Sequence, residues 1–244
     1  MADLDSASTE ITEEEVADVL APARFNEEMV RSELEEIVGQ DHISTKESDR
    51  LVYSCDWFWL PQMWLDRGKR TPAPDYVVHP GSVEEITEIM KVANNFDIPV
   101  VPWGGGSGTQ GGALPIYGGI ILDLKRLNEI IEIDEESLTV TAEAGINGQQ
   151  LEWALNERGL TLPHYPASAN CATLGGYLAP RGSGTISTKY GKAEELVLNM
   201  EVVLPDGHVM RTPHVPNHAA GPGFMNLFLG SEGTLGTITE ATMQ

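Results

Sequence analysis

Six of the nine residues from Gly104 to Gly112 are glycines, directly after the apolar, β-branched run 98–102. Glycine adopts backbone conformations that other residues rarely reach, and it lets a ligand approach the chain closely. A loop of this kind can turn successive backbone amides toward one point and bind an anion, with the hydroxyls of Ser107 and Thr109 as further donors. The loop therefore predicts a phosphate or diphosphate site.

Two common phosphate-binding motifs do not fit this loop. A Walker loop ends in Gly-Lys followed by Ser or Thr, and no lysine occurs between Lys91 and Lys125. A Rossmann motif opens a helix at the loop, whereas Pro115, Gly118 and Gly119 follow here. We therefore expect backbone amides to hold the phosphate without a lysine. A flexible linker is the alternative, but apolar runs bound the loop on both sides.

Two further segments are rich in small residues, at positions 166–191 and 229–239. Small residues let the chain approach a flat or narrow ligand closely. With the glycine loop, these segments favour one extended ligand held between two lobes. A dinucleotide has the required size, although composition alone does not identify which one.

Charge and composition exclude several classes of protein. The net charge is −22, from 37 acidic and 15 basic side chains, whereas affinity for nucleic acids and acidic membranes comes from Lys and Arg. No apolar run reaches the roughly 18 residues of a spanning helix, and the first residues lack the basic and apolar regions of a signal peptide. Cys55 and Cys171 alone form neither a disulfide framework nor a metal cluster. We expect a soluble, cytoplasmic protein without a metal, a nucleic-acid partner or a membrane span.

The chain before position 74 differs from the rest. Residues 1–50 hold 15 acidic and 4 basic side chains, and we expect residues 1–25 to be a mobile acidic tail. Residues 26–73 are interpreted as a helical, aromatic lead-in arm, with an amphipathic helix from Asn26 that stops at Gly39. Four aromatic residues cluster in this arm: Trp57, Phe58, Trp59 and Trp64. We expect them to line a pocket, to cover an interface or to pack on the core.

From position 74 the pattern predicts an α+β fold with two α/β lobes, residues 74–140 and 141–244. Ser82 and Glu85 have capping-box spacing at the start of a helix. Strands are expected at 75–78, 98–102, 119–124, 129–134, 138–143, 196–204 and 208–211, and helices at 82–95 and 147–158.

The three small-residue segments together resemble the FAD-binding domain of the vanillyl-alcohol oxidase (PCMH-type) superfamily, from about Pro74 to Met243. The sequence VPWGGGSGTQGGALP is most similar to the diphosphate loop of the glycolate and D-lactate dehydrogenase branch. CATLGGYLAPRGSGTISTKYGKAEELV and GSEGTLGTITEAT are similar to that branch and to alkyldihydroxyacetonephosphate synthases. The resemblance implies a two-lobed PCMH-type fold that binds FAD.

The family's binding roles carry over to matching positions. The diphosphate is assigned to Pro102, Trp103, Gly104, Gly105, Gly106, Ser107, Gly108 and Thr109. The flavin and ribityl part is assigned to Ala167, Ser168, Ala169, Asn170, Cys171, Ala172, Thr173, Gly176, Pro180, Arg181, Gly182 and Ser183, with Gly184 allowing close approach. The adenine side is assigned to Glu232, Gly233, Thr234, Leu235, Gly236, Thr237 and Ile238.

Departures from the family pattern bear on how FAD is held. Relatives that attach FAD through a loop histidine carry it within the glycine loop, and no histidine occurs between His79 and His164. We therefore expect non-covalent FAD, with Cys171 as the alternative tether or as a small buried side chain. The histidines nearest the flavin segments are His164, His214 and His218. Replacing Gly105 or Gly106 with valine is expected to abolish FAD binding, because a β-branched side chain disfavours positive φ and blocks the approach of the backbone to the phosphate.

The resemblance also implies a substrate domain beyond the GSEGTLGTITEAT segment, and the sequence stops at Gln244. We therefore expect the catalytic residues, which stay unassigned, on a second protein chain, with an electron-acceptor subunit as a further partner. The favoured function is the FAD-binding subunit of a dehydrogenase or oxidase acting on a 2-hydroxy acid or another alcohol. The alternatives are an FAD-dependent transferase similar to the alkyldihydroxyacetonephosphate synthases and a non-catalytic flavin-binding or assembly fragment.

Overall fold

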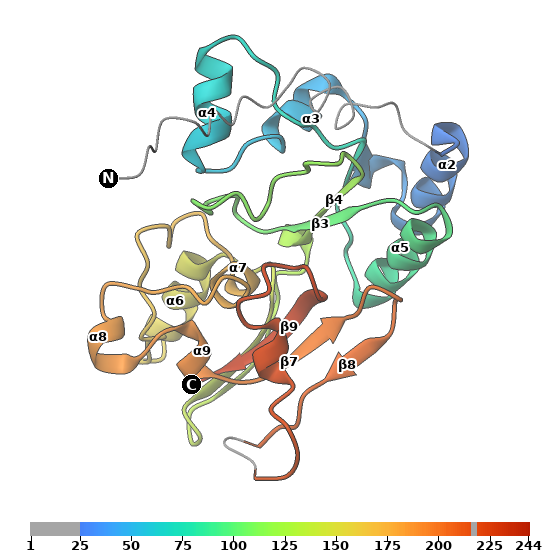
Figure 1. Cartoon of the computed structure of the whole chain (residues 1–244). Coiled ribbons are helices and arrows are strands. Elements are labelled where there is room, and N and C mark those ends of the chain that lie inside the picture. The colour runs from blue at the N-terminus through green and yellow to red at the C-terminus, as the bar shows by residue number, and fades with distance from the viewer. Residues whose placement is uncertain (1–24, 216–218) are drawn as a thin grey trace, which may run out of the picture.

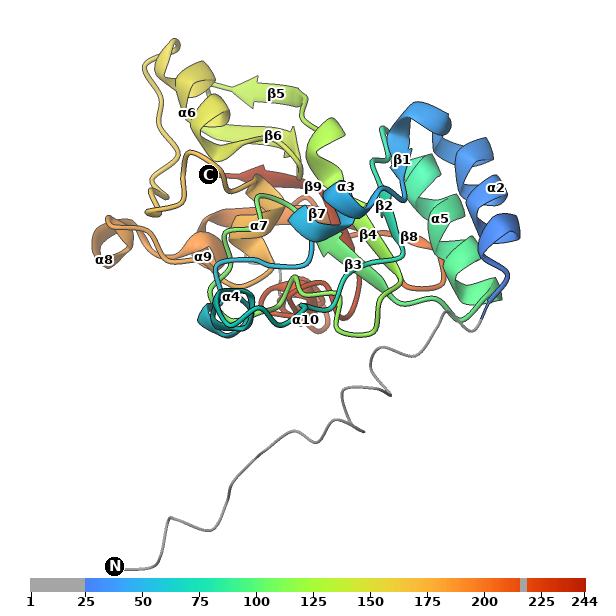
Figure 2. The same ribbon diagram turned by 90° about the horizontal axis from the view of Figure 1, so that it is seen from above.

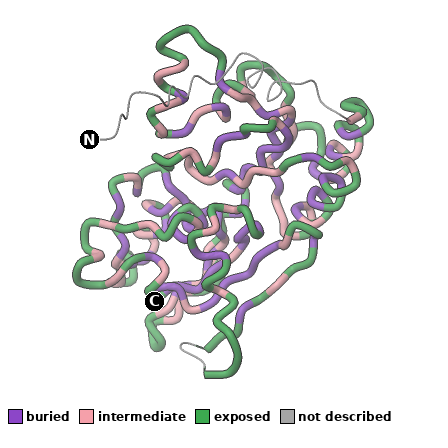
Figure 3. The backbone as a smooth tube through the Cα atoms, in the orientation of Figure 1, coloured by how far each residue is buried: buried purple, intermediate pink, exposed green. Residues whose placement is uncertain are grey.

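The computed structural model describes residues 25–215 and 219–244, and its elements form two β-sheets with flanking helices (Figure 1). The tail predicted for residues 1–25 lies outside the described residues except for Phe25, and His218 lies outside them too. Buried residues follow the strands and the inner faces of the helices, while the connecting loops are mostly exposed (Figure 3). The two sheets with their helices confirm the predicted α+β class.

The lead-in segment begins with the predicted helix. Helix α2 (Glu27–Val38) starts where the Asn26 side chain accepts a hydrogen bond from the Met29 amide at 3.2 Å, and it ends at Gly39 with a φ of 82°. Its buried face packs against helix α5 (Val83–Asn95). The remaining lead-in elements are η1 (Gln40–His42), β1 (Ile43–Ser44), α3 (Glu47–Val52) and α4 (Trp59–Asp66).

The first sheet has the strand order β1-β2-β4-β3, with β1 antiparallel to its neighbour. Its parallel strands are β2 (Tyr76–Val78), β4 (Ile120–Asp123) and β3 (Val100–Trp103). The glycine loop follows β3, and Leu124 follows β4. Both therefore leave the sheet at the carboxyl edge of its parallel strands, where ligands commonly bind in α/β sheets.

Helix α5 begins as predicted at Ser82, whose hydroxyl accepts a hydrogen bond from the Glu85 amide at 3.2 Å. The Glu85 carboxylate accepts from the Gly81 amide at 2.6 Å, one residue before the predicted partner. The capping box is thus half formed, and its second hydrogen bond fixes the turn that enters the helix.

The second sheet is antiparallel throughout, with the order β5-β6-β9-β7-β8. Its strands are β5 (Ile130–Asp134), β6 (Thr139–Glu143), β7 (Val197–Val203), β8 (Val209–Arg211) and β9 (Thr237–Met243). The last strand of the chain lies in the middle of this sheet, between β6 and β7. The sheet is therefore complete only when the C-terminal segment is in place.

The division between the sheets falls earlier in the chain than the predicted lobes 74–140 and 141–244. Strands β5 and β6 both belong to the second sheet, so the division lies between η2 (Leu124–Arg126) and β5. The lead-in also adds β1 to the first sheet. A hairpin pattern in the sequence predicts only its own two strands. The other neighbour of β6 is β9, where Val140 pairs with Met243, and this strand is remote in sequence.

Helices cover one face of the second sheet. Helix α6 (Gly148–Asn156) and helix α7 (Leu174–Leu178) contribute to the same hydrophobic core as β6, β7 and β9, and Figure 2 shows them on one side of these strands. The short helices α8 (Ser187–Tyr190), α9 (Ala193–Leu196) and α10 (Met225–Phe228) were not predicted, because four residues carry no helical periodicity. Across residues 25–215 and 219–244, each helix is too short or too polar to cross a bilayer.

Candidate cofactor site

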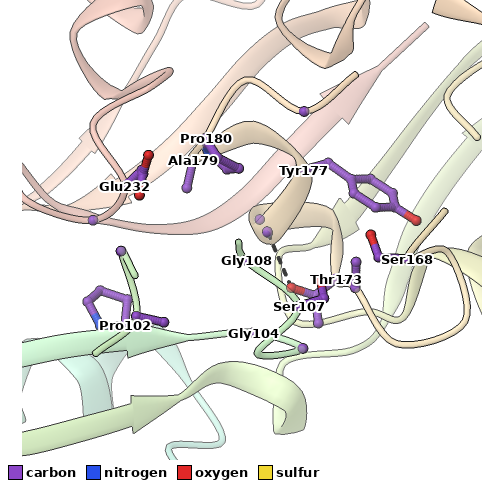
Figure 4. Close-up of a pocket in the computed structure, with 18 of the residues that line it drawn as sticks. Pro102, Gly104, Ser107, Gly108, Ser168, Thr173, Tyr177, Ala179, Pro180 and Glu232 are labelled. Carbon is purple, nitrogen blue, oxygen red and sulfur yellow. Dashed lines mark hydrogen bonds between the residues drawn. The ribbon is translucent and has the colours of Figure 1, made fainter. Parts of the chain in front are cut away.

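A cavity of about 450 Å³ lies where the glycine loop meets the second sheet (Figure 4). It brings together all residues from Pro102 to Thr109 with parts of both other predicted segments. The lining residues predicted from those segments are Ser168, Ala172, Thr173, Gly176, Pro180, Arg181, Gly182, Ser183, Glu232, Gly233, Gly236 and Ile238. Residues far apart in the sequence thus converge on one cavity.

Other predicted residues do not line this cavity. Leu235 is an exposed side chain, and the open side of Gly184 faces the Tyr165 backbone instead of the cavity. Thr234 and Thr237 line a neighbouring cavity of about 440 Å³, which shares Pro102, Gly233 and Gly236 with the first. Four further predicted residues do not line the first cavity: Ala167, Ala169, Asn170 and Cys171.

Several lining residues were not among the predicted site residues. Gln110, Gly112 and Ala113 continue the glycine loop, so its length gave the signal for them. Leu124 ends the predicted strand 119–124 and Gly175 lies within the predicted segment 166–191, and neither has a chemical signal of its own. The other residues of this group are His164, Pro166, Tyr177 and Ala179, of which His164 had been singled out as a candidate histidine.

Three consecutive glycines are required by three different contacts. A Cβ atom on Gly105 would lie 2.6 Å from the carbonyl carbon of Cys171 and 2.9 Å from Cα of Ala172. A Cβ on Gly104 would overlap the Thr173 hydroxyl, and one on Gly106 would lie 2.5 Å from the Trp103 ring. The loop therefore packs against the second lobe.

This geometry corrects the reason given for the glycines. Gly106 has the expected positive φ, 62°, but Gly105 does not. Gly105 is needed because two backbone segments touch there. The same segment is ordered by Thr173, whose hydroxyl caps α7 by accepting from the Gly176 amide at 3.2 Å (Figure 4, dashed line). The flexible-linker interpretation does not fit a loop held by such contacts.

Two charged residues line the cavity in strained conformations. Arg181 and Glu232 have φ values of 56° and 51°, in the left-handed region that disfavours side chains. Such strain is found preferentially at functional sites. Among the described residues lining this cavity, Arg181 is the only Lys or Arg, so an anion bound there meets mainly backbone amides and hydroxyls.

The lead-in segment supports the glycine loop from outside. The Tyr53 hydroxyl donates to the fully buried Asp123 carboxylate at 2.6 Å, and the Tyr53 ring packs edge-on against Trp103, with 5.1 Å between ring centroids. A Cβ on Gly111 would lie 3.0 Å from the Phe58 ring. The predicted arm is therefore part of the wall that positions the loop, and part of the aromatic cluster packs on it.

Asp56 lies beneath the same loop. It is 4% exposed, and its Oδ1 accepts from the Phe58 amide at 2.9 Å. Burial raises the pKa of Asp56 above its ordinary value, while the amides of Phe58, Ala113 and Gly111 act in the opposite direction. Its Oδ2 is buried without a hydrogen-bond partner within the protein and would lie 3.5 Å from a Cβ on Gly108.

Two other sequence candidates lie outside the cavity. The Cys171 thiol is exposed and donates to the Ser168 carbonyl at 3.4 Å. His214 lies 3.1 Å from the Asn199 side chain, measured between Nδ1 and Nδ2. In the described part of the chain, no cluster of His, Cys, Asp or Glu is arranged to hold a metal.

The sequence matches the family profile described as an FAD binding domain over residues 74–213. It is 35% identical over 216 residues to the glycolate oxidase subunit GlcD of Bacillus subtilis (strain 168), covering 88% of this chain and 44% of that protein. It is 34% identical over 221 residues to a probable mitochondrial D-lactate dehydrogenase of Danio rerio, covering 89% of this chain and 42% of that protein.

A solved alkyldihydroxyacetonephosphate synthase has the same fold, with a TM-score of 0.81 and 32% identity, covering 91% of this chain and 44% of that one. The chain thus spans less than half the length of the relatives that it matches. The cavity also fits the cofactor, because the glycine-rich loop from Pro102 to Thr109 lines it and can offer backbone amides to a diphosphate. The chain therefore belongs to the FAD binding domain family of PCMH-type flavoproteins, with FAD as its cofactor.

Proposed function

We propose that this chain is the FAD-binding part of a dehydrogenase or oxidase that acts on a 2-hydroxy acid or another alcohol. The family is one of FAD-linked oxidoreductases, and the named substrates of two relatives, glycolate and D-lactate, are both 2-hydroxy acids. The observation that carries the proposal is the glycine loop packed against the 171–173 segment, beside a cavity of about 450 Å³ that the loop lines.

The chain's own residues bind and orient the cofactor. FAD, when bound, supplies the redox chemistry by accepting a pair of electrons from the substrate. The amides of the loop from Gly104 to Thr109 would hold the diphosphate, and Ser168 and Tyr177 would lie at the flavin end (Figure 4). Arg181 and Ser183 at the cavity are exposed to solvent. Polypeptide outside these 244 residues is therefore proposed to exclude water and to supply the catalytic acids and bases.

A transferase similar to alkyldihydroxyacetonephosphate synthase is the second candidate, favoured by the match to that enzyme's structure. Anaerobic addition of glycolate, D-lactate or another alcohol to the FAD-loaded protein, purified with its partner chain, separates the two. A dehydrogenase bleaches the flavin absorbance in proportion to substrate and passes the electrons to an added acceptor. The transferase passes no electrons to an acceptor. A non-catalytic flavin-binding fragment keeps its FAD spectrum with every substrate.

FAD is expected to be bound without a covalent bond. The loop contains no histidine, and Cys171 lies outside the lining of the cavity. Acid precipitation of the holoprotein should therefore release all the flavin into the supernatant, where its absorbance is measured against protein. Cys171→Ser should release the same amount. Yellow pellets from the parent protein and colourless ones from Cys171→Ser would instead identify Cys171 as a tether.

We also propose that a second protein chain supplies the substrate domain, with an electron-acceptor subunit as a further partner. GlcD is named a subunit, and Trp57 and Trp59 are 67% and 62% exposed, a feature common at interfaces. The net charge of −22 favours a partner with a basic face.

In native-host purification, a second chain is expected to co-elute with this protein and to dissociate from it at high salt. A monomer that oxidises substrate alone would contradict this proposal. The cytoplasmic location expected from the sequence stays a prediction.

A further inference from the structure

His164 is a buried histidine whose hydrogen bonds are missing. It is 4% exposed, and neither Nδ1 nor Nε2 has a hydrogen-bond partner within the protein. Buried polar side chains in folded proteins nearly always have a partner, because an unpaired buried group costs about 1–3 kcal/mol. His164 also lines the cofactor cavity. A ligand in that cavity is therefore the natural source of the missing partner.

The neighbours of His164 fix where its ring sits. Its imidazole packs edge-on against the Tyr177 ring, with 4.5 Å between centroids and an interplanar angle of 69°. A Cβ atom on Gly182 would lie 3.5 Å from Nε2, so Gly182 lies beside that nitrogen without offering it a side-chain partner. Both Tyr177 and Gly182 line the cavity. The imidazole is thus held in place by packing, and both of its nitrogens are buried without a hydrogen-bond partner within the protein.

The imidazole is suited to bond a neutral polar group. Burial lowers the pKa of His164 below its ordinary value of 6.5, and the Glu194 carboxylate opposes this. A neutral imidazole has one donor and one acceptor nitrogen, and the tautomer follows the partner. Glu194 is the competing explanation, because its Oε2 is also buried without a partner.

The position of His164 in the cavity selects one end of the dinucleotide. In Figure 4, Tyr177 and Ser168 lie on one side of Gly108, whereas Glu232 and Pro102 lie on the other. A diphosphate on the glycine loop therefore directs the two halves of FAD to opposite ends. His164 contacts Tyr177, at the end where Ser168, assigned to the flavin, also lies.

We propose that His164 is a cofactor-positioning residue that forms a hydrogen bond with the flavin half of FAD. The inference rests on the proposed arrangement of FAD in this cavity. The bonding groups offered by that half are the ribityl hydroxyls and the carbonyl and N–H groups of the flavin ring, and a neutral imidazole matches all of them. The ADP half, at the Glu232 end, does not contact His164.

The test compares two ligands on the FAD-free full chain. His164→Phe keeps a planar ring against Tyr177 but removes both nitrogens. It should weaken FAD binding about tenfold, equivalent to about 1.4 kcal/mol, and change the Kd for ADP by less than about twofold. Titrations followed by calorimetry and flavin fluorescence give both constants. His164→Gln, which restores a bonding group near the position of Nε2, should recover part of the FAD affinity.

Controls separate this proposal from its alternatives. Glu194→Gln should leave the Kd for FAD unchanged, and thermal melting without ligand checks that each variant folds. An equal loss of FAD and ADP affinity in His164→Phe would assign His164 to the fold or to the other half of the cofactor. Unchanged affinity for both ligands would also overturn the proposal. If the parent chain binds no FAD, the proposed function itself fails.

Discussion

Gly105→Ala is expected to abolish FAD binding, with the Kd rising at least about a hundredfold. The added methyl group would meet backbone atoms of Cys171 and Ala172, which cannot rotate away as a side chain can. The loop must then separate from the second lobe, and several backbone hydrogen bonds to the diphosphate are lost together. Each such charge-assisted bond contributes about 1.5–3 kcal/mol, so losing two already exceeds a hundredfold. The flavin content after purification and a fluorescence titration measure the effect.

Gly223→Ala is the matched control for this variant. Gly223 has no positive φ, lies outside the cavity, and its Cβ would meet only the side-chain amide of Asn226 at 3.1 Å. It should purify with the same FAD content as the parent protein. If Gly105→Ala kept its flavin at micromolar concentration, the contact between loop and second lobe would not be needed for binding, and the assignment of the diphosphate site would be wrong.

Asp123→Ala is expected to lower the free energy of unfolding by about 3 kcal/mol. The fully buried carboxylate accepts from the Tyr53 hydroxyl at 2.6 Å and from the Lys125 amide at 3.0 Å, and it pairs with the Lys125 ammonium at 2.7 Å. A hydrogen bond to a charged group contributes about 1.5–3 kcal/mol and a helix cap about 1 kcal/mol. Urea unfolding of the FAD-free protein measures the loss.

Two variants divide this loss between the partners of Asp123. Tyr53→Phe removes one hydrogen bond and should cost about 1.5 kcal/mol. Lys125→Ala should cost less than about 1 kcal/mol, because the lysine side chain is 48% exposed and exposed ion pairs contribute little. Equal small effects for all three variants would show that Tyr53 and Asp123 do not hold the lead-in segment to the first sheet.

Local chemistry in the sequence was sufficient for several elements. Asn26 and Ser82 are capping residues followed by apolar residues at helical spacing, so α2 and α5 begin where predicted. The glycine loop was recognised because six glycines after a strand have few structural explanations. Sheet order was not accessible in the same way. Strand β9 carries no local sign that it lies between β6 and β7.

The sequence by itself determined the α+β class and predicted a glycine loop suited to a diphosphate, because short-range spacing and composition encode these properties, and the resemblance of three motifs identified the family. Only the tertiary structure decided which glycines are indispensable and why: Gly105 by its contact with Cys171. It alone revealed that Tyr53 of the lead-in supports the loop, and that His164 lines the cavity without a partner within the protein. Each of these features joins residues remote along the chain, and a residue's neighbours across such a distance depend on the packing of whole lobes rather than on local sequence.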